Sequence, residues 1–152
     1  MKVLNNNHLR RIALEVILND VKSISYDGRK IRKFAQTVPA SFFAEIIDSV
    51  SHRLITRFSL YTILSLCNKN RNPDRILKSI LDEHNLHAIN DGEELERLCL
   101  DVIKENPKQL ERYKNNPKKS LEQLQMALCK KYHGRIHEDL VINIFKRVLE
   151  KQ

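Results

Sequence analysis

Cationic side chains are concentrated between residues 104 and 135, where only Glu105, Glu111 and Glu122 carry negative charge. Ammonium and guanidinium groups donate charge-assisted hydrogen bonds to phosphate oxygens, so a dense group of them can bind a polyanion. Contacts of this kind supply affinity and register rather than base recognition. The cationic residues of the stretch are Lys104, Lys108, Arg112, Lys114, Lys118, Lys119, Lys130, Lys131 and Arg135.

The charge of the whole chain favours the same chemistry. The net charge is +8 at pH 7 and the pI is near 9.5. From Glu96 onward thirteen Lys and Arg face eight Asp and Glu, whereas the first 95 residues hold fourteen and eleven. The charge favours a polyanionic partner, with nucleic acid ahead of an anionic membrane surface. No apolar run approaches the ~20 residues of a membrane span. We expect RNA as the partner, and neither DNA nor a membrane. A solvated surface without a ligand is the alternative explanation of the charge.

Three rings lie near these cations. Tyr113, Tyr132 and His133 could each stack on an unpaired base. Ordinary packing at a helix edge explains a tyrosine equally well, and we favour that explanation for Tyr113.

Signals of catalysis or metal binding are weak. His84 and His87 are three residues apart, but no nearby carboxylate or cysteine completes a tetrahedral ligand set. Cys67, Cys99 and Cys129 are widely spaced on apolar stretches, as expected of reduced core thiols. The chain has no glycine-rich phosphate loop and no local signature of a Ser-His-Asp or Cys-His site. We expect no catalytic residue, no metal ligand and no cofactor bound by this chain.

Helix signals place the cations on three short helices. Asp91 with Glu94 predicts a capping box at the start of the first one. Asn106-Pro107 and Asn116-Pro117 each predict one helix ending and another beginning, because proline suits a first helical position. Gly134 is expected at the C′ position after the last of the three. The apolar face of the first helix is expected to hold Leu95, Leu98, Cys99, Val102 and Ile103.

Further helices are expected before and after this stretch. The predicted all-α fold has two small units, a helical bundle over residues 1–90 and a three- to four-helix tail over residues 91–152, with Asn85 in a left-handed turn near the junction. The basic cluster Arg29, Lys30, Arg32 and Lys33 follows a turn at Tyr26-Asp27-Gly28 and is expected to be a solvated surface. The inward-facing positions are expected to be Leu9, Ile12, Ala13, Val16 and Ile17; Phe42, Phe43, Ile46, Ile47 and Val50 after Pro39; Leu60, Ile63, Leu64 and Cys67 after a Thr56 N-cap; Ile76, Leu77, Ile80 and Leu81 after Asn72-Pro73-Asp74; and Leu140, Val141, Ile144, Phe145, Val148 and Leu149 after His137.

Several short motifs resemble the GatB/YqeY tail domain, which ends the B subunit of glutamine-dependent aminoacyl-tRNA amidotransferases. The order and spacing of the motifs carry the resemblance, which extends upstream into the helical segment that precedes the tail in GatB. The matching pieces are Ile103 to Pro107, Tyr113-Lys114, Lys119-Ser120-Leu121, Lys130, His133-Gly134-Arg135, Asp139-Leu140-Val141 and Ile144, preceded by Pro39 to Leu64, Asn72-Pro73-Asp74 and Ile89 to Glu96.

The resemblance implies a function in translation. It identifies the chain as the tRNA-binding end of a B subunit that works with an amidase (A) subunit, a small (C) subunit, ATP and magnesium to convert Glu-tRNA(Gln), and in many organisms Asp-tRNA(Asn), to the amide. No part of the chain resembles the catalytic cradle, so it is either a fragment or acts beside a partner. The residues expected to contact tRNA are Lys118, Lys119, Lys130, Lys131, His133, Gly134 and Arg135.

Two departures from the family pattern affect this expectation. Asn116-Pro117 replaces a glycine-containing turn, and Met126 stands where the family favours a glycine that permits close approach of a helix or of RNA. These departures favour a mitochondrial (matrix) version of the subunit over one from bacterial cytoplasm. A helical adaptor that docks a protein through apolar stripes, or a free-standing YqeY-like protein, are the alternative functions.

Overall fold

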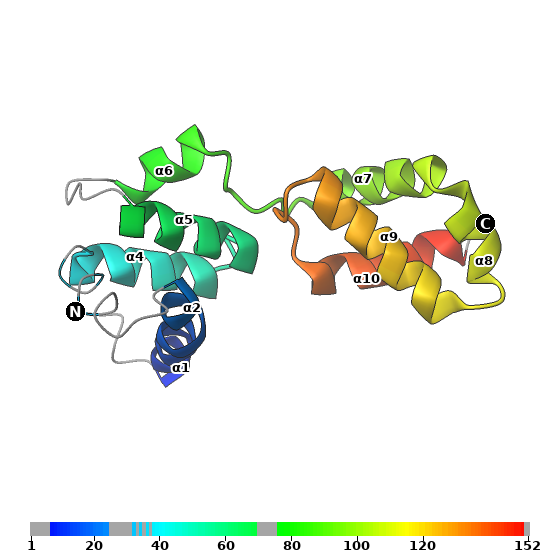
Figure 1. The fold of residues 1–152 in the computed structure, drawn as a ribbon. Coiled ribbons are helices and arrows are strands. Elements are labelled where there is room, and N and C mark those ends of the chain that lie inside the picture. Colours follow the sequence, from blue (N-terminus) through cyan, green and yellow to red (C-terminus); the bar gives the residue numbers. More distant parts are fainter. Residues whose placement is uncertain are drawn as a thin grey trace. The chain divides into compact units, whose positions relative to one another are not determined.

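The computed structural model describes residues 7–24, 32, 34, 36, 38–69 and 76–150. All regular elements in these ranges are helices, which confirms the predicted all-α class (Figure 1). The chain divides into unit 1, Met1–His87, and unit 2, Ala88–Gln152. Each unit has a hydrophobic core made of its own side chains. None of the helices in the described ranges is both long and apolar enough to cross a membrane.

The elements of unit 1 are α1 (Asn7–Glu15), the π-helical η2 (Val16–Val21), α2 (Lys22–Ile24), α4 (Ala40–Ser51), α5 (Arg57–Lys69) and α6 (Leu77–Glu83). The first three form one continuous helical segment, in which the α-helix widens to a π-helix and then returns to an α-helix. Ile46, Ile47, Ile63 and Leu64 are at most 1% exposed at the centre of the core. Thr56 caps α5 as predicted, because its Oγ1 accepts a hydrogen bond from the Ser59 amide at 3.2 Å.

Two inward-facing predictions for unit 1 are wrong. Ile17 is 45% exposed, since η2 winds with the wider π turn and leaves the α-helical register on which the prediction rested. Ile76 is 65% exposed, because it precedes the first turn of α6 in extended conformation. The predicted turn at Tyr26-Asp27-Gly28, the cations Arg29, Lys30 and Lys33, and the predicted helix start at Asn72-Pro73-Asp74 lie outside the described residues.

Unit 2 contains four helices in its described part, and the predicted starts of these helices are confirmed. These are α7 (Gly92–Glu105), α8 (Pro107–Tyr113), α9 (Pro117–Lys131) and α10 (Glu138–Leu149). Asn106 ends α7 and Pro107 starts α8, while the Asn116 side chain accepts a hydrogen bond from the Lys119 amide at 3.2 Å. Helices α7, α9 and α10 pack on one another around a shared core (Figure 1).

The core of unit 2 is formed by the predicted apolar stripes. All five residues expected on the inner face of α7 are buried. Phe145 of α10 is fully buried, as are Leu124 and Leu128 of α9. These side chains hold α9 in place, so its opposite face and its two ends remain for contact with a ligand.

Three described helices end in left-handed residues that are not glycine. The backbones of Arg53, Asn85 and His133 have φ values of 59°, 51° and 51°. At the end of α9 the Gly134 amide bonds to the Cys129 carbonyl at 2.8 Å and the His133 amide to the Lys130 carbonyl, which is a Schellman motif. His133 therefore occupies C′, and the prediction of Gly134 at that position is wrong by one residue. Asn85 fills the left-handed position predicted for it.

The capping bond of Asp91 gives a first testable prediction. Its Oδ1 accepts a hydrogen bond from the Glu94 amide at 2.8 Å. We expect Asp91→Ala to destabilise unit 2 by about 1 kcal/mol, because an N-terminal amide of α7 loses its acceptor. Glu93→Ala is the matched control, since it removes a carboxylate from the same turn without removing that bond. Equal losses in urea-induced unfolding would show that helix-dipole charge, rather than the cap, stabilises α7.

Candidate nucleic-acid interface

The structure separates the predicted tRNA-contact residues into two groups at opposite ends of α9. Lys118 and Lys119 occupy the second and third helical positions. Lys130 and Lys131 form the last turn, and His133, Gly134 and Arg135 follow in the connection to α10. At 1.5 Å per residue, Lys118 and Lys130 are about 18 Å apart along the helix axis. The residues therefore form two groups of cations rather than one cluster.

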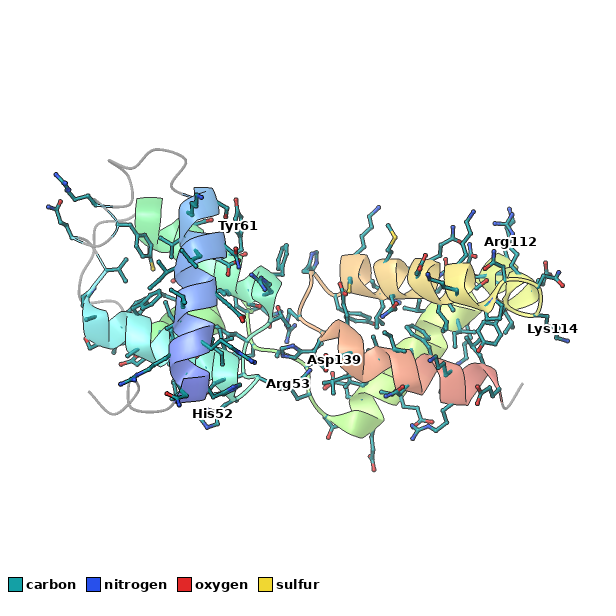
Figure 2. All side chains as sticks on the ribbon, turned by 90° about the horizontal axis from the view of Figure 1, so that it is seen from below. His52, Arg53, Tyr61, Arg112, Lys114 and Asp139 are labelled. Carbon is teal, nitrogen blue, oxygen red and sulfur yellow. The ribbon has the colours of Figure 1, made fainter. Side chains whose placement is uncertain are left out.

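The turn between α8 and α9 adds two cations to the first group. Arg112 lies in the last turn of α8 and Lys114 follows that helix, both exposed at this end of unit 2 (Figure 2). The sequence identified both residues as part of the basic stretch but did not assign them to the contact set. The sequence signal that places them here is the short connection that ends at Pro117. We call Arg112, Lys114, Lys118 and Lys119 the turn group.

Lysines 118 and 119 stand where a helix disfavours positive charge. The amino-terminal end of an α-helix carries a partial positive charge, so cations in the first turn cost about 0.3–1 kcal/mol each at low salt. The first turn of α9 contains no acidic residue to compensate. By contrast, Lys130 and Lys131 lie at the carboxyl end, where the dipole favours them. Helix stability thus explains the second pair but not the first.

The exposed face of α9 connects the two groups. Lys119 and Lys130 are close to three full turns apart and therefore share a face. Met126 lies on the same face between them and is 71% exposed. Its side chain takes no space from the core, so an approaching ligand meets a methionine with a lysine on either side. A thioether in this position supplies adaptable apolar contact.

Lys131 forms an ion pair within unit 2. Its Nζ donates a hydrogen bond to Glu105 Oε1 at 2.6 Å and lies 5.7 Å from the centre of the Tyr132 ring. The hydrogen bond with Glu105 is the largest of the effects that raise the pKa of Lys131 above its ordinary value. The pair joins the end of α9 to the end of α7, so Lys131 holds the helix end in addition to any contact with a ligand.

The α9–α10 connection has a defined shape. The Arg135 carbonyl accepts a hydrogen bond from the Ile89 amide at 2.8 Å, and Gly134 has a φ of 66°. Tyr113 and Tyr132 are partly buried against the core of unit 2, as expected of helix-edge packing. His133 is exposed. Of the three rings considered for base stacking, His133 is therefore the most accessible.

Comparison with known proteins identifies the family. Residues 2–149 match the GatB domain. The chain belongs to the GatB domain family. It is homologous to the C-terminal region of the amidotransferase B subunit, as the sequence motifs predicted.

The relatives are much longer proteins, each named as the B subunit of an aspartyl/glutamyl-tRNA(Asn/Gln) amidotransferase. The protein from Methanococcus maripaludis (strain C7) is 25% identical over 139 residues, which cover 91% of this chain and 29% of that protein. The protein from Methanocaldococcus jannaschii is 28% identical over 141 residues, covering 92% and 29%. The protein from Borrelia hermsii is 28% identical over 122 residues, covering 80% and 24%. This GatB domain chain therefore spans less than a third of the length of these relatives.

In this GatB domain, contacts within the fold account for His87 and Cys99, two of the residues considered as metal ligands or reactive groups. His87 Nε2 lies 2.7 Å from Asp82 Oδ1. In the described ranges no group of three His, Cys, Asp or Glu residues is arranged to hold a metal ion. No disulfide joins the cysteines, and Cys99 is fully buried on the inner face of α7. Burial, and to a lesser degree the nearby Glu96, raises the pKa of Cys99 from 9.0 to about 12.

The state of Cys99 gives a second prediction. We expect the folded chain to resist alkylation of Cys99 by iodoacetamide at pH 8.5, because the reactive thiolate does not form in the core. The pKa of Cys99 is higher in the folded state than in the unfolded state. The stability that comes from keeping this thiol neutral is therefore complete below pH 9.0 and is lost as the pH rises toward 12. Mass spectrometry of alkylated peptides, with urea-unfolded protein as the control, tests this. Equal rates in both states would contradict a buried thiol.

The ion pair of Lys131 gives a third prediction. Glu105→Gln removes the negative charge, so the pKa of Lys131 should fall toward its ordinary value, which NMR titration of the lysine side chains would detect. The contribution of the pair to stability is complete below pH 10.5 and is lost as the pH rises through the raised pKa. Glu122→Gln, which lowers negative charge on α9 itself, is the control. An unchanged Lys131 titration would contradict the pair in solution.

Proposed function

We propose that unit 2 binds tRNA through phosphate contacts along α9 and that the chain is the tRNA-binding part of an aminoacyl-tRNA amidotransferase B subunit. The observation that supports this most strongly is the position of Lys118 and Lys119 at the amino-terminal end of α9. A phosphate placed there would be attracted by the ammonium groups and by the helix dipole together. Phosphate binding would also offset the electrostatic cost of placing Lys118 and Lys119 in the first turn of α9, which has no acidic residue.

The two-ended arrangement of cations supports a large ligand. A ligand that contacts the turn group and Lys130 at once must present phosphates about 18 Å apart along α9. A folded RNA presents such phosphates along its backbone, whereas a single nucleotide cannot. Phosphate contacts then fix the RNA on the helix, while Met126 between the two groups and His133 just beyond Lys130 contact sugar or base surfaces.

The complete reaction belongs to a larger assembly in this proposal. The A and C subunits and a catalytic cradle would supply ATP- and magnesium-dependent amidation of Glu-tRNA(Gln), and in some organisms of Asp-tRNA(Asn). This chain would contribute tRNA affinity and no catalytic residue. A mitochondrial matrix location is part of the proposal, with bacterial cytoplasm as its alternative. A free-standing YqeY-like role would apply if the chain bound tRNA but failed to assemble with A and C subunits.

Binding to tRNA across a salt series is the experiment that tests the proposal. The chain would be titrated with a folded tRNA and with a plain RNA hairpin of similar net charge. We expect tighter binding to tRNA, with a log–log salt slope of about 0.7 to 0.9 per phosphate contact. Equal and weak binding of both RNAs would leave the cations as a solvated surface and contradict the proposal.

A further inference from the structure

Unit 1 exposes two rows of large apolar side chains on neighbouring helical segments. The first row lies on α1 and η2, where Leu14, Ile17 and Leu18 are 56%, 45% and 56% exposed. The second row lies at and before the start of α5, where Leu54, Phe58 and Tyr61 are 52%, 53% and 49% exposed. Isolated exposed apolar residues are common, but six on two neighbouring segments, five of them helical, are typical of an interaction surface.

An ion pair joins the two segments that carry these rows. Arg57 donates through Nε to Asp20 Oδ1 at 3.3 Å and through a terminal nitrogen to Asp20 Oδ2 at 3.2 Å. Helices η2 and α5 are in contact, and this ion pair links them, so the two segments that carry the rows lie next to each other. Figure 2 shows Tyr61 beside the segment that contains η2. We call these six apolar residues the unit 1 apolar surface.

The charges around this surface select the partner. Arg11, Lys22, Arg53 and Arg57 are exposed on the same segments or next to them. The acidic residues of these segments are Glu15, which pairs loosely with Arg11 at 3.7 Å, and Asp20, which is buried against Arg57. A basic rim attracts an acidic partner and repels a second copy of itself. The rim therefore disfavours self-association and favours a partner with acidic residues beside its apolar ones.

The shape of the surface indicates the form of that partner. The described part of unit 1 forms no strand and so offers no sheet edge for strand addition. Exposed apolar side chains on two helical segments in contact can pack against the apolar stripe of a third helix. We propose that the unit 1 apolar surface docks an amphipathic helix of another protein whose apolar stripe is flanked by acidic residues. This second binding function does not depend on tRNA binding by unit 2.

A designed peptide provides a direct probe. It would be about 20 residues long, enough to form a helix, with leucines at i, i+3, i+4 and i+7 and glutamates beside them. One control peptide has the same composition with the leucines dispersed, and the other has lysines in place of glutamates. We expect the full chain to bind the acidic amphipathic peptide in fluorescence anisotropy and to bind both controls at least about tenfold more weakly.

Matched variants of the chain locate the binding. Leu14→Gln with Leu18→Gln, and separately Phe58→Gln, should each weaken peptide binding about tenfold or more, because each removes a large apolar contact. Ile76→Gln is the control, since it removes an apolar side chain that is 65% exposed in unit 1 outside the surface. The substituted residues are all exposed, and a thermal melt of each variant verifies that it remains folded.

Three outcomes would overturn the proposal. The first is equal binding of the ordered and dispersed peptides, and the second is an Ile76→Gln effect as large as that of Phe58→Gln. The third is binding of phosphatidylcholine–phosphatidylserine vesicles, or self-association in sedimentation, in place of peptide binding. A full chain that binds the peptide but not tRNA would contradict only the function proposed for unit 2. A full chain that binds tRNA but not the peptide would contradict only the present inference.

Discussion

Replacing Lys118, Lys119 and Lys130 with glutamate is expected to weaken tRNA binding by at least about a hundredfold. A lysine–phosphate contact in water contributes about 1 kcal/mol, and three lost contacts therefore correspond to a factor of about a hundred. The reversed charges also repel the phosphates that they replace. The measurement is a binding titration at fixed salt, repeated at several salt concentrations. The salt slope should fall by about 0.7 to 0.9 for each contact removed.

A charge-matched variant separates position from net charge. Lys22, Lys78 and Lys146 are exposed residues of α2, α6 and α10 and are not part of α9. Changing these three residues to glutamate alters the net charge of the chain by the same amount. We expect this control to weaken tRNA binding only slightly and to leave the salt slope nearly unchanged. Similar losses in both variants would mean that overall charge, and not the α9 surface, determines binding.

The α9 variant is also expected to be at least as stable as the parent chain. Glutamates at positions 118 and 119 suit the positive end of the helix dipole, whereas the native lysines do not. Glutamate at position 130 acts in the opposite direction at the carboxyl end. A fall in tRNA affinity with an unchanged melting temperature would therefore reflect lost contacts. A variant that unfolds would instead show that the native lysines stabilise α9, contrary to the dipole argument.

Much of the fold could be predicted because its signals are local. Asp91 caps α7, Asn106-Pro107 and Asn116-Pro117 separate the helices, and Asn85 adopts the left-handed conformation. Each of these features depends on a few neighbouring residues and on backbone sterics. The apolar periodicity of α7 similarly identified the core face of that helix.

The errors arise where geometry depends on more than local pattern. A π-helical segment rotates Ile17 out of the expected register, and His133 takes the C′ position expected for Gly134, although both residues are left-handed. The ion pair between Lys131 and Glu105 joins residues from two helices, which periodicity cannot detect.

The structure also changes the relation between two functions that the sequence presents as alternatives. A tRNA-binding tail and a protein-docking adaptor compete only if one surface must serve both. The described cations of the candidate interface lie on unit 2, whereas the exposed apolar rows lie on unit 1. A single chain can therefore carry both functions, and the variants proposed for each unit test them separately.

Phe145→Ala is expected to give the largest loss of stability, about 3 to 5 kcal/mol in unit 2. Phe145 is fully buried in α10 among apolar residues of α7 and α9. Alanine leaves a cavity that rigid neighbouring helices fill only in part. Since small domains are stable by only about 5–15 kcal/mol, a large share of unit 2 would unfold on mild heating.

Amide hydrogen exchange tests how far this loss extends. We expect the amides of α7, α9 and α10 to lose protection in Phe145→Ala, while those of α4 and α5 keep it, because the two cores share no buried residue. Ile144→Ala is the control, since that neighbouring side chain is only partly buried. Loss of protection in both units would mean that they unfold as one. In that case a substitution in α10 would also reduce peptide binding by unit 1, and only variants of exposed residues could separate the two proposed functions.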